Sequence, residues 1–249
     1  MIPISDDNSG LRTTPFVTWA LIAANCFVFV FLQGFGANER FTLAYAAVPY
    51  EILTGRDVAQ SIPIRDEYGR TRGHIDLQPT PIPVFLTLLT SMFLHGGLAH
   101  IAGNMLYLHV FGDNVEDALG HGRFLVFYLL CGTLAGLAHV ATTALLRSGL
   151  LMPSLGASGA ISGILAAYVV LFPRRRVRIL WLFSLIDVPA VFSIGIWFVF
   201  QVISGLGMLG GESSGVAYGA HIGGFLAGLI LVRPFAGGGR RPAIAGSWR

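Results

Sequence analysis

Six long apolar stretches, separated by polar connections, constrain this chain more than any other feature of its sequence. They cover residues 15–35, 97–116, 124–146, 157–172, 189–208 and 217–233. A helix that crosses a lipid bilayer needs about 20 mostly apolar residues. Because lipid offers no hydrogen-bond partner to an exposed backbone, such stretches cross it as helices. We therefore predict an all-α, polytopic membrane protein with a bundle of six transmembrane helices.

Composition supports this class and argues against a nucleic-acid-binding protein. Only 12% of the residues are charged and the mean hydropathy is +0.68, whereas a soluble domain carries about 25% charged residues. The net charge of +3 comes from arginines that gather in short connections and form no extended basic stripe. We expect a lipid bilayer as the surroundings of this chain and no nucleic acid as a partner.

The connections suggest a single membrane domain over residues 1–249. Residues 36–96 form a long outer loop, and its apolar part from Val84 to Leu94 is expected to lie on the membrane. The fourth stretch has only about 16 residues, which is short for a lipid-facing span. We expect this helix in the middle of the bundle, where it can hold a sunken site. Residues 234–249 are expected to form a cytoplasmic tail.

The arginines predict the orientation of the bundle. Ten of them fall at one side of the predicted spans: Arg12, Arg123, Arg174, Arg175, Arg176, Arg178, Arg233, Arg240, Arg241 and Arg249. Short cytoplasmic connections carry an excess of basic residues, whereas long loops are discounted in such a count. Both termini are therefore expected in the cytoplasm. The compact form suggests a bacterial plasma membrane.

The fourth helix begins with a serine among small residues: Gly156, Ala157, Ser158 and Gly159. Small neighbours leave the Ser158 hydroxyl uncovered and allow close approach of other helices, so Ser158 is a candidate nucleophile. The alternative is a serine that bonds back to its own helix in a packing seam.

The sixth helix carries an ionisable residue, His221, near its start. Ionisable residues within membrane helices are costly and indicate function, and a neutral imidazole can accept the proton of a serine. Gly224 and Gly228 have the spacing that lets two helices pack closely, and the fourth helix is the expected partner. The alternative is a histidine that only makes an interhelical hydrogen bond.

Two polar residues, His100 and Asn104, lie four positions apart near the start of the second helix, so they share one face. Both can donate hydrogen bonds to an oxyanion, and the Ser158 amide at a helix start can add a third. The alternative is that both only join helices. Because helices two, four and six all run inward, all these residues are expected at one depth.

These motifs resemble the rhomboid family of intramembrane proteases, in which a His with an Asn four residues later, a GxSG motif and a late-helix His occur in this order. The resemblance covers residues 95–232. It implies a Ser158–His221 dyad without a third carboxylate, with His100, Asn104 and the Ser158 amide around the oxyanion. This agrees with our expectation that no acidic residue lies within a span.

Two features differ from the family pattern. An aromatic residue often follows the nucleophile by four positions, and this chain has Ser162 there. The outer loop often carries a Trp-Arg pair, and residues 36–80 contain no Trp. The glycine-rich segment from Leu209 to Tyr218 resembles the family's gating loop, in which Val216 or Tyr218 is expected to plug the site.

The resemblance and the residues imply an endopeptidase acting on transmembrane protein substrates. No HExxH motif or pair of intramembrane aspartates is present, so we expect no metal and no cofactor. His139 and His109 are interpreted as packing or interfacial residues. Two alternatives remain: a catalytically inactive rhomboid-like protein that binds transmembrane segments, and a small transporter, which would place polar residues near the midplane. Nothing in the sequence indicates an oligomeric state.

Overall fold

The computed structural model describes residues 2–65, 68, 70–209 and 217–237, and within them six helices have 12 residues or more. They are α1 (Phe16–Phe27), α5 (Leu98–Leu119), α6 (His121–Leu146), α7 (Ser158–Leu171), α8 (Ala190–Leu209) and α9 (Tyr218–Ala236). A π-helical segment, Val28–Leu32, extends α1. With that extension, all six begin and end within three residues of the predicted stretches.

The six helices differ in whether they are long enough to cross a bilayer. By length and hydropathy α6 and α9 can each cross one, and Val84–Phe93 with α5 qualifies as a further span bent by 81°. Phe16–Leu32, Ser158–Leu171 and Ala190–Leu206 are shorter apolar helices. The 14 residues of α7 measure about 21 Å, less than the roughly 30 Å of a hydrocarbon core. The chain is a mostly helical polytopic membrane protein.

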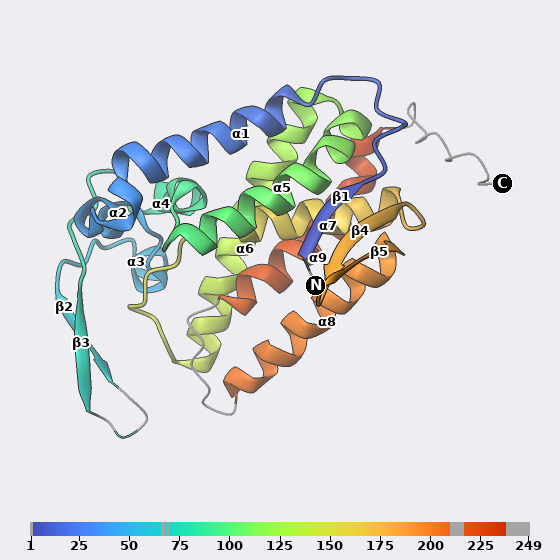
Figure 1. The fold of residues 1–249 in the computed structure, drawn as a ribbon. Coiled ribbons are helices and arrows are strands. Elements are labelled where there is room, and N and C mark those ends of the chain that lie inside the picture. Colours follow the sequence, from blue (N-terminus) through green and yellow to red (C-terminus); the bar gives the residue numbers. More distant parts are fainter. Residues whose placement is uncertain (1, 66–67, 69, 210–216, 238–249) are drawn as a thin grey trace.

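The short helix α7 lies in the centre of the bundle, against α5, α6 and α9 (Figure 1). Residues 159–168 are all buried, as the length of this helix predicts. Small residues permit the contact, since a Cβ placed on Gly228 would lie 2.3 Å from the Gly163 carbonyl oxygen. Gly163 itself packs against Cys131 of α6. The backbones of three helices therefore approach one another closely.

The connection between α1 and α5 is built from short elements. These are α2 (Glu39–Tyr45), α3 (Pro49–Thr54), the hairpin of β2 (Ser61–Arg65) and β3 (Thr71–Asp76), and helical turns at Val84–Leu86, α4 (Thr87–Thr90) and Ser91–Phe93. The hairpin projects from the helices (Figure 1). A β-bridge joins Ala47 to Ser154, which attaches this connection to the segment that enters α7.

Two small sheets correct the prediction of an all-α fold. Besides β2–β3, the strands β1 (Ile2–Asp6), β4 (Arg176–Trp181) and β5 (Ser184–Pro189) form an antiparallel sheet in the order β1-β4-β5. The segment Arg176–Trp181 alternates in polarity: Val177 and Ile179 are buried while Arg176 and Arg178 are exposed. Alternation with a period of two favours a half-buried strand. This short segment directly after the fourth helix is not a long apolar stretch, so the search for spans did not predict it.

The expectation that no acidic residue lies within a span is wrong for α5. Asp113 and Glu116 are buried in its last two turns. Glu116 accepts hydrogen bonds from the backbone amides of Val17 and Thr18 at 3.0 and 2.7 Å, and lies 2.6 Å from the His121 Nδ1. Because the first amides of a helix have no partner within it, this carboxylate satisfies the start of α1 and fixes α1 to α5.

Candidate active site

The local backbone before Ser158 explains why this serine opens a helix with little cover. Gly156 has φ of +127°, a conformation that favours glycine, and its amide donates to the Ser91 carbonyl at 2.8 Å. Ala157 is fully buried and Ser158 begins α7. The turn therefore places a half-buried hydroxyl at the amino-terminal end of the central helix.

His221 meets this hydroxyl across the bundle. Its Nε2 lies 2.7 Å from the Ser158 Oγ, although 63 residues separate the two in sequence. The helices come close because α9 presents glycine to α7: a Cβ on Gly224 would lie 2.0 Å from the Gly159 carbonyl oxygen. The spacing that the sequence analysis singled out thus occurs at the contact that brings imidazole and hydroxyl together.

The other ring nitrogen of His221 has a partner that the sequence analysis missed. Gln201 of α8 places its Oε1 2.7 Å from the His221 Nδ1. Trp197, one turn earlier on α8, has its ring centroid 6.1 Å from that of His221, and Tyr218 lies at 6.4 Å with its ring perpendicular. Side chains of α8 and α9 therefore surround the imidazole. The sequence did offer a signal for Gln201, because it is the only amide side chain in the apolar sequence of α8.

Ser162, the departure from the family pattern, has no described hydrogen bond to His221. Its hydroxyl donates to the Ser158 carbonyl at 2.7 Å, so this serine bonds back to its own helix. The support that an aromatic side chain would give from α7 comes instead from α8 and from Tyr218.

His100, near the start of α5, lies beside the turn that enters α7, and Asn104 follows it one turn later on the same helix. A Cβ on Gly156 would lie 2.9 Å from the His100 Nε2 and 3.7 Å from the Ser158 Oγ, so both atoms flank one position. The Gly96 amide donates to the His100 Nδ1 at 3.3 Å, which leaves Nε2 as the protonated nitrogen of a neutral ring. Asn104 is buried, and its Nδ2 donates to the His100 carbonyl at 3.1 Å.

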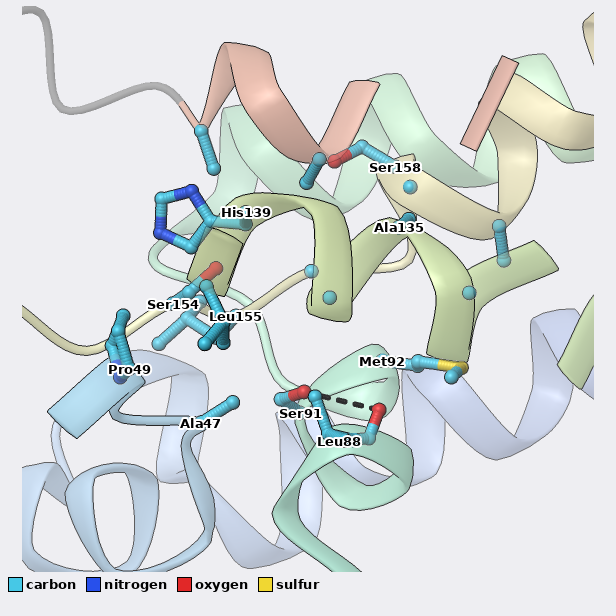
Figure 2. A pocket seen from close by; sticks show the side chains of 18 residues that line it. Ala47, Pro49, Leu88, Ser91, Met92, Ala135, His139, Ser154, Leu155 and Ser158 are labelled. Carbon is cyan, nitrogen blue, oxygen red and sulfur yellow. Dashed lines mark hydrogen bonds between the residues drawn. The ribbon is translucent and has the colours of Figure 1, made fainter. Parts of the chain in front are cut away.

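A small cavity of about 40 Å³ adjoins Ser158. Its lining is mostly small side chains and glycines, with Ala135 and His139 from α6 and Ser154 and Leu155 from the segment before α7 (Figure 2). A cavity of this size has room for water. His139, which the sequence analysis interpreted as a packing residue, is one of its polar walls.

One expectation cannot be compared with the structure because of where it falls in the chain. The predicted cap falls largely on residues 210–216, so it and Val216 lie outside the described residues, as does most of the tail. Within the part of the chain that the structure describes, no three His, Cys, Asp or Glu side chains form a group that could hold a metal ion. His221 also has no hydrogen bond to a described carboxylate; its described partners are Ser158 and Gln201.

The fold and this site define a polytopic helical membrane protein with a serine and a histidine paired between buried helices. A model of the Rhomboid domain matches residues 84–237, well over half of the chain. The chain therefore belongs to the rhomboid family, which confirms the resemblance seen in the motifs of His100, Ser158 and His221.

Relatives with this domain come from bacteria and mitochondria. The chain is 36% identical over 151 residues to rhomboid protease GluP of Bacillus subtilis, covering 60% of this chain and 27% of the relative. It is 30% identical over 161 residues to mitochondrial rhomboid protein 1 of Saccharomyces cerevisiae, covering 62% and 43%. It is 38% identical over 96 residues to the human mitochondrial presenilin-associated rhomboid-like protein, covering 38% and 24%. The matched region spans less than half of each relative.

Proposed function

We propose that this chain is an intramembrane serine endopeptidase that cleaves transmembrane segments of membrane proteins near the outer face. Ser158 is the nucleophile and His221 is its general base. The observation that carries the proposal is the 2.7 Å contact between the His221 Nε2 and the Ser158 Oγ inside a bundle of apolar helices. Membership of the rhomboid family, and a relative whose name includes the word protease, support it.

The reaction begins when a substrate segment enters laterally, unwinds near the outer face and presents a carbonyl carbon to Ser158. His221 takes the hydroxyl proton as the Oγ–C bond forms, and the carbonyl oxygen becomes an oxyanion. His100 through Nε2–H, Asn104 through Nδ2 and the Ser158 amide donate to that oxygen. The position of His100 beside Gly156, close to the hydroxyl, supports this role.

The tetrahedral intermediate collapses when the peptide C–N bond breaks and His221 gives its proton to the leaving amine. An acyl-enzyme on Ser158 remains. Water then attacks the ester carbonyl with His221 as base, which releases the new carboxylate and restores the hydroxyl. The cavity beside Ser158 supports access of water below the membrane surface. No metal or cofactor takes part in these steps.

We propose the bacterial plasma membrane as the location, with six spans and both termini in the cytoplasm. The support is the arginine content of the short connections and the six apolar helices of 12 residues or more, of which, within the described residues, α6 and α9 alone are each long enough to cross a bilayer unaided. The family also includes mitochondrial relatives, so the orientation needs its own test, described below.

The activity is tested by reconstituting the purified protein in liposomes with a tagged single-span substrate, comparing the native chain with Ser158→Ala. We expect cleavage by the native chain alone. Capture of substrate without cleavage by either protein would favour the alternative, an inactive rhomboid-like protein that binds transmembrane segments. Equal cleavage by both proteins would overturn the proposed nucleophile.

A further inference from the structure

The contact between Gln201 and His221 bears on which nitrogen of the imidazole carries the proton. A neutral imidazole has one N–H donor and one acceptor nitrogen. The Gln201 Oε1, 2.7 Å from Nδ1, can only accept a hydrogen bond, so Nδ1 must donate. The Nε2 is then unprotonated and faces the Ser158 Oγ at 2.7 Å. This is the tautomer that a general base for Ser158 requires.

Gln201 is itself held in place. Its side chain is 6% exposed, and it lies one helical turn after Trp197, whose indole faces the same imidazole. Trp197 also lies next to Phe225 of α9, with ring centroids 6.5 Å apart. A buried amide on a packed helix has few alternative positions, so its oxygen remains directed at His221.

Other described neighbours of His221 do not offer this contact. Ser162 uses its hydroxyl on the Ser158 carbonyl, and the rings of Trp197 and Tyr218 stand more than 6 Å from the imidazole, centroid to centroid. His100 and His139 are titratable groups that act on His221 electrostatically, and no described hydrogen bond joins either of them to it. Among the described residues, the hydrogen bond at Nδ1 thus comes from one residue of α8.

We propose that Gln201 is the positioning residue of the dyad: it fixes the tautomer and the ring orientation of His221 from α8. This inference rests on the proposed function. In a Ser-His-Asp triad a carboxylate holds the imidazole and stabilises its protonated form. An amide oxygen accepts the same hydrogen bond without a charge, so here the orientation is retained and most of the electrostatic stabilisation is given up.

The test uses two substitutions of Gln201 by side chains of similar volume. Gln201→Met removes the acceptor with little change in volume, and Gln201→Glu keeps an acceptor and adds a charge. Ser193→Ala is the matched control, because Ser193 lies on the same helix and its described side-chain hydrogen bond goes to the Ala190 carbonyl of that helix. Each protein is reconstituted with the tagged single-span substrate, and kcat, KM, the pH profile of kcat and the unfolding temperature are measured.

For Gln201→Met we expect kcat to fall about ten- to hundredfold, as for a lost hydrogen bond that orients the base, with KM and unfolding temperature close to native. Gln201→Glu should keep most of the activity at high pH. Its carboxylate favours the protonated imidazole, so the acidic limb of its pH profile should move to higher pH. Ser193→Ala should match the native chain.

An unchanged kcat in Gln201→Met would overturn the inference. If Gln201→Met does not fold, Gln201→Glu decides: an acidic limb at the native position would show that residue 201 does not act on His221. Failure of the proposed function looks different, because the native chain itself would then not cleave, or Ser158→Ala would cleave equally.

Discussion

The Asn104 side chain uses one of its two amide hydrogens in the hydrogen bonds of the described residues. Its Nδ2 donates to the His100 carbonyl one turn earlier, and an amide nitrogen carries two hydrogens. The side chain is 7% exposed, on the helix whose His100 ring adjoins Gly156. We propose that the second hydrogen is donated to the oxyanion that forms beside Ser158.

Removing this donor should slow the chemical step. We expect Asn104→Ala to lower kcat about 100-fold, as for a lost oxyanion donor, with a small change in KM. The check is steady-state cleavage in liposomes, with Gly103→Ala as control, because a Cβ on Gly103 meets no atom within 4 Å. A native kcat in Asn104→Ala would remove Asn104 from the oxyanion site.

Sequence alone was informative for residues whose type is rare in lipid. A histidine among glycines in an apolar stretch, such as His221, stands out because charge is costly there. Gln201 does not stand out in this way, since an amide in a membrane helix is also a common interhelical contact. Its partner lies 20 residues away on another helix, and only the packing of α8 on α9 shows that the two meet.

Among the elements, α7 and α9 have the closest contact near the site. A Cβ on Gly224 would lie 2.0 Å from the Gly159 carbonyl oxygen and 3.2 Å from the Ala135 Cβ. A backbone oxygen at that distance cannot move aside as a flexible side chain can. The two helices must separate, and His221 moves with α9.

Gly224→Ala should therefore reduce both stability and activity. We expect a loss of about 2–3 kcal/mol in the free energy of unfolding, from overpacking, together with a large fall in kcat, because the bond from His221 to Ser158 lengthens. Thermal unfolding in detergent and cleavage in liposomes measure the two effects. The control is again Gly103→Ala, and native behaviour of Gly224→Ala would contradict the packing described here.

The strand β1 is attached to the bundle through a half-buried acid, Asp6. The Asp6 carboxylate accepts a hydrogen bond from the Tyr168 hydroxyl at 2.5 Å and one from the Asn114 Nδ2 at 2.7 Å. Burial raises the pKa of Asp6 from 3.8 to about 7, although the Tyr168 hydrogen bond opposes this. The folded chain therefore binds a proton at this site more tightly than the unfolded chain.

This raised pKa makes the contribution of Asp6 depend on pH. Between about pH 4 and 7 the unfolded chain loses the proton while the folded chain keeps it, so stability falls as pH rises through this window. Asp6→Asn should remove this dependence and be more stable than the native chain at pH 8, by at most about 4 kcal/mol, the free energy that a pKa shift of this size represents. Unfolding curves of both proteins from pH 4 to 8 provide the test, and curves that run parallel would contradict it.

The long helices were predicted closely and the strands were not. Apolar length marks a span because lipid requires it, which fixed α5 and α6 to within three residues. The segment Arg176–Trp181 is short and alternates in polarity, and its pairing with Ile2–Asp6 joins residues that are 171 to 178 positions apart in the chain. Contacts of this range are not visible in a local pattern.

For the whole molecule, the bundle has distinct ends. The β2–β3 hairpin projects at one end, whereas the α7–β4 connection lies at the other end of α7, away from Ser158 (Figure 1). Arg174 in that connection belongs to the basic set predicted to face the cytoplasm, and His74 lies in β3. These two positions should be on opposite sides of the membrane.

Cysteine labelling tests this orientation. After Cys26 and Cys131 are replaced by serine, we expect His74→Cys to react with a membrane-impermeant maleimide in intact spheroplasts, and Arg174→Cys only after lysis. The cysteine-free protein is the control. The reverse labelling pattern would contradict the proposed orientation, because it would place the site near the cytoplasmic face and both termini outside.

The central claim is that His221 activates Ser158, and the most direct measurement is the rate at which a fluorophosphonate labels Ser158, read by peptide mass spectrometry. We predict one adduct on Ser158 in the native chain, none in Ser158→Ala, and labelling at least about a thousandfold slower in His221→Ala. An adduct on another residue, or equal rates in the native chain and His221→Ala, would contradict the account.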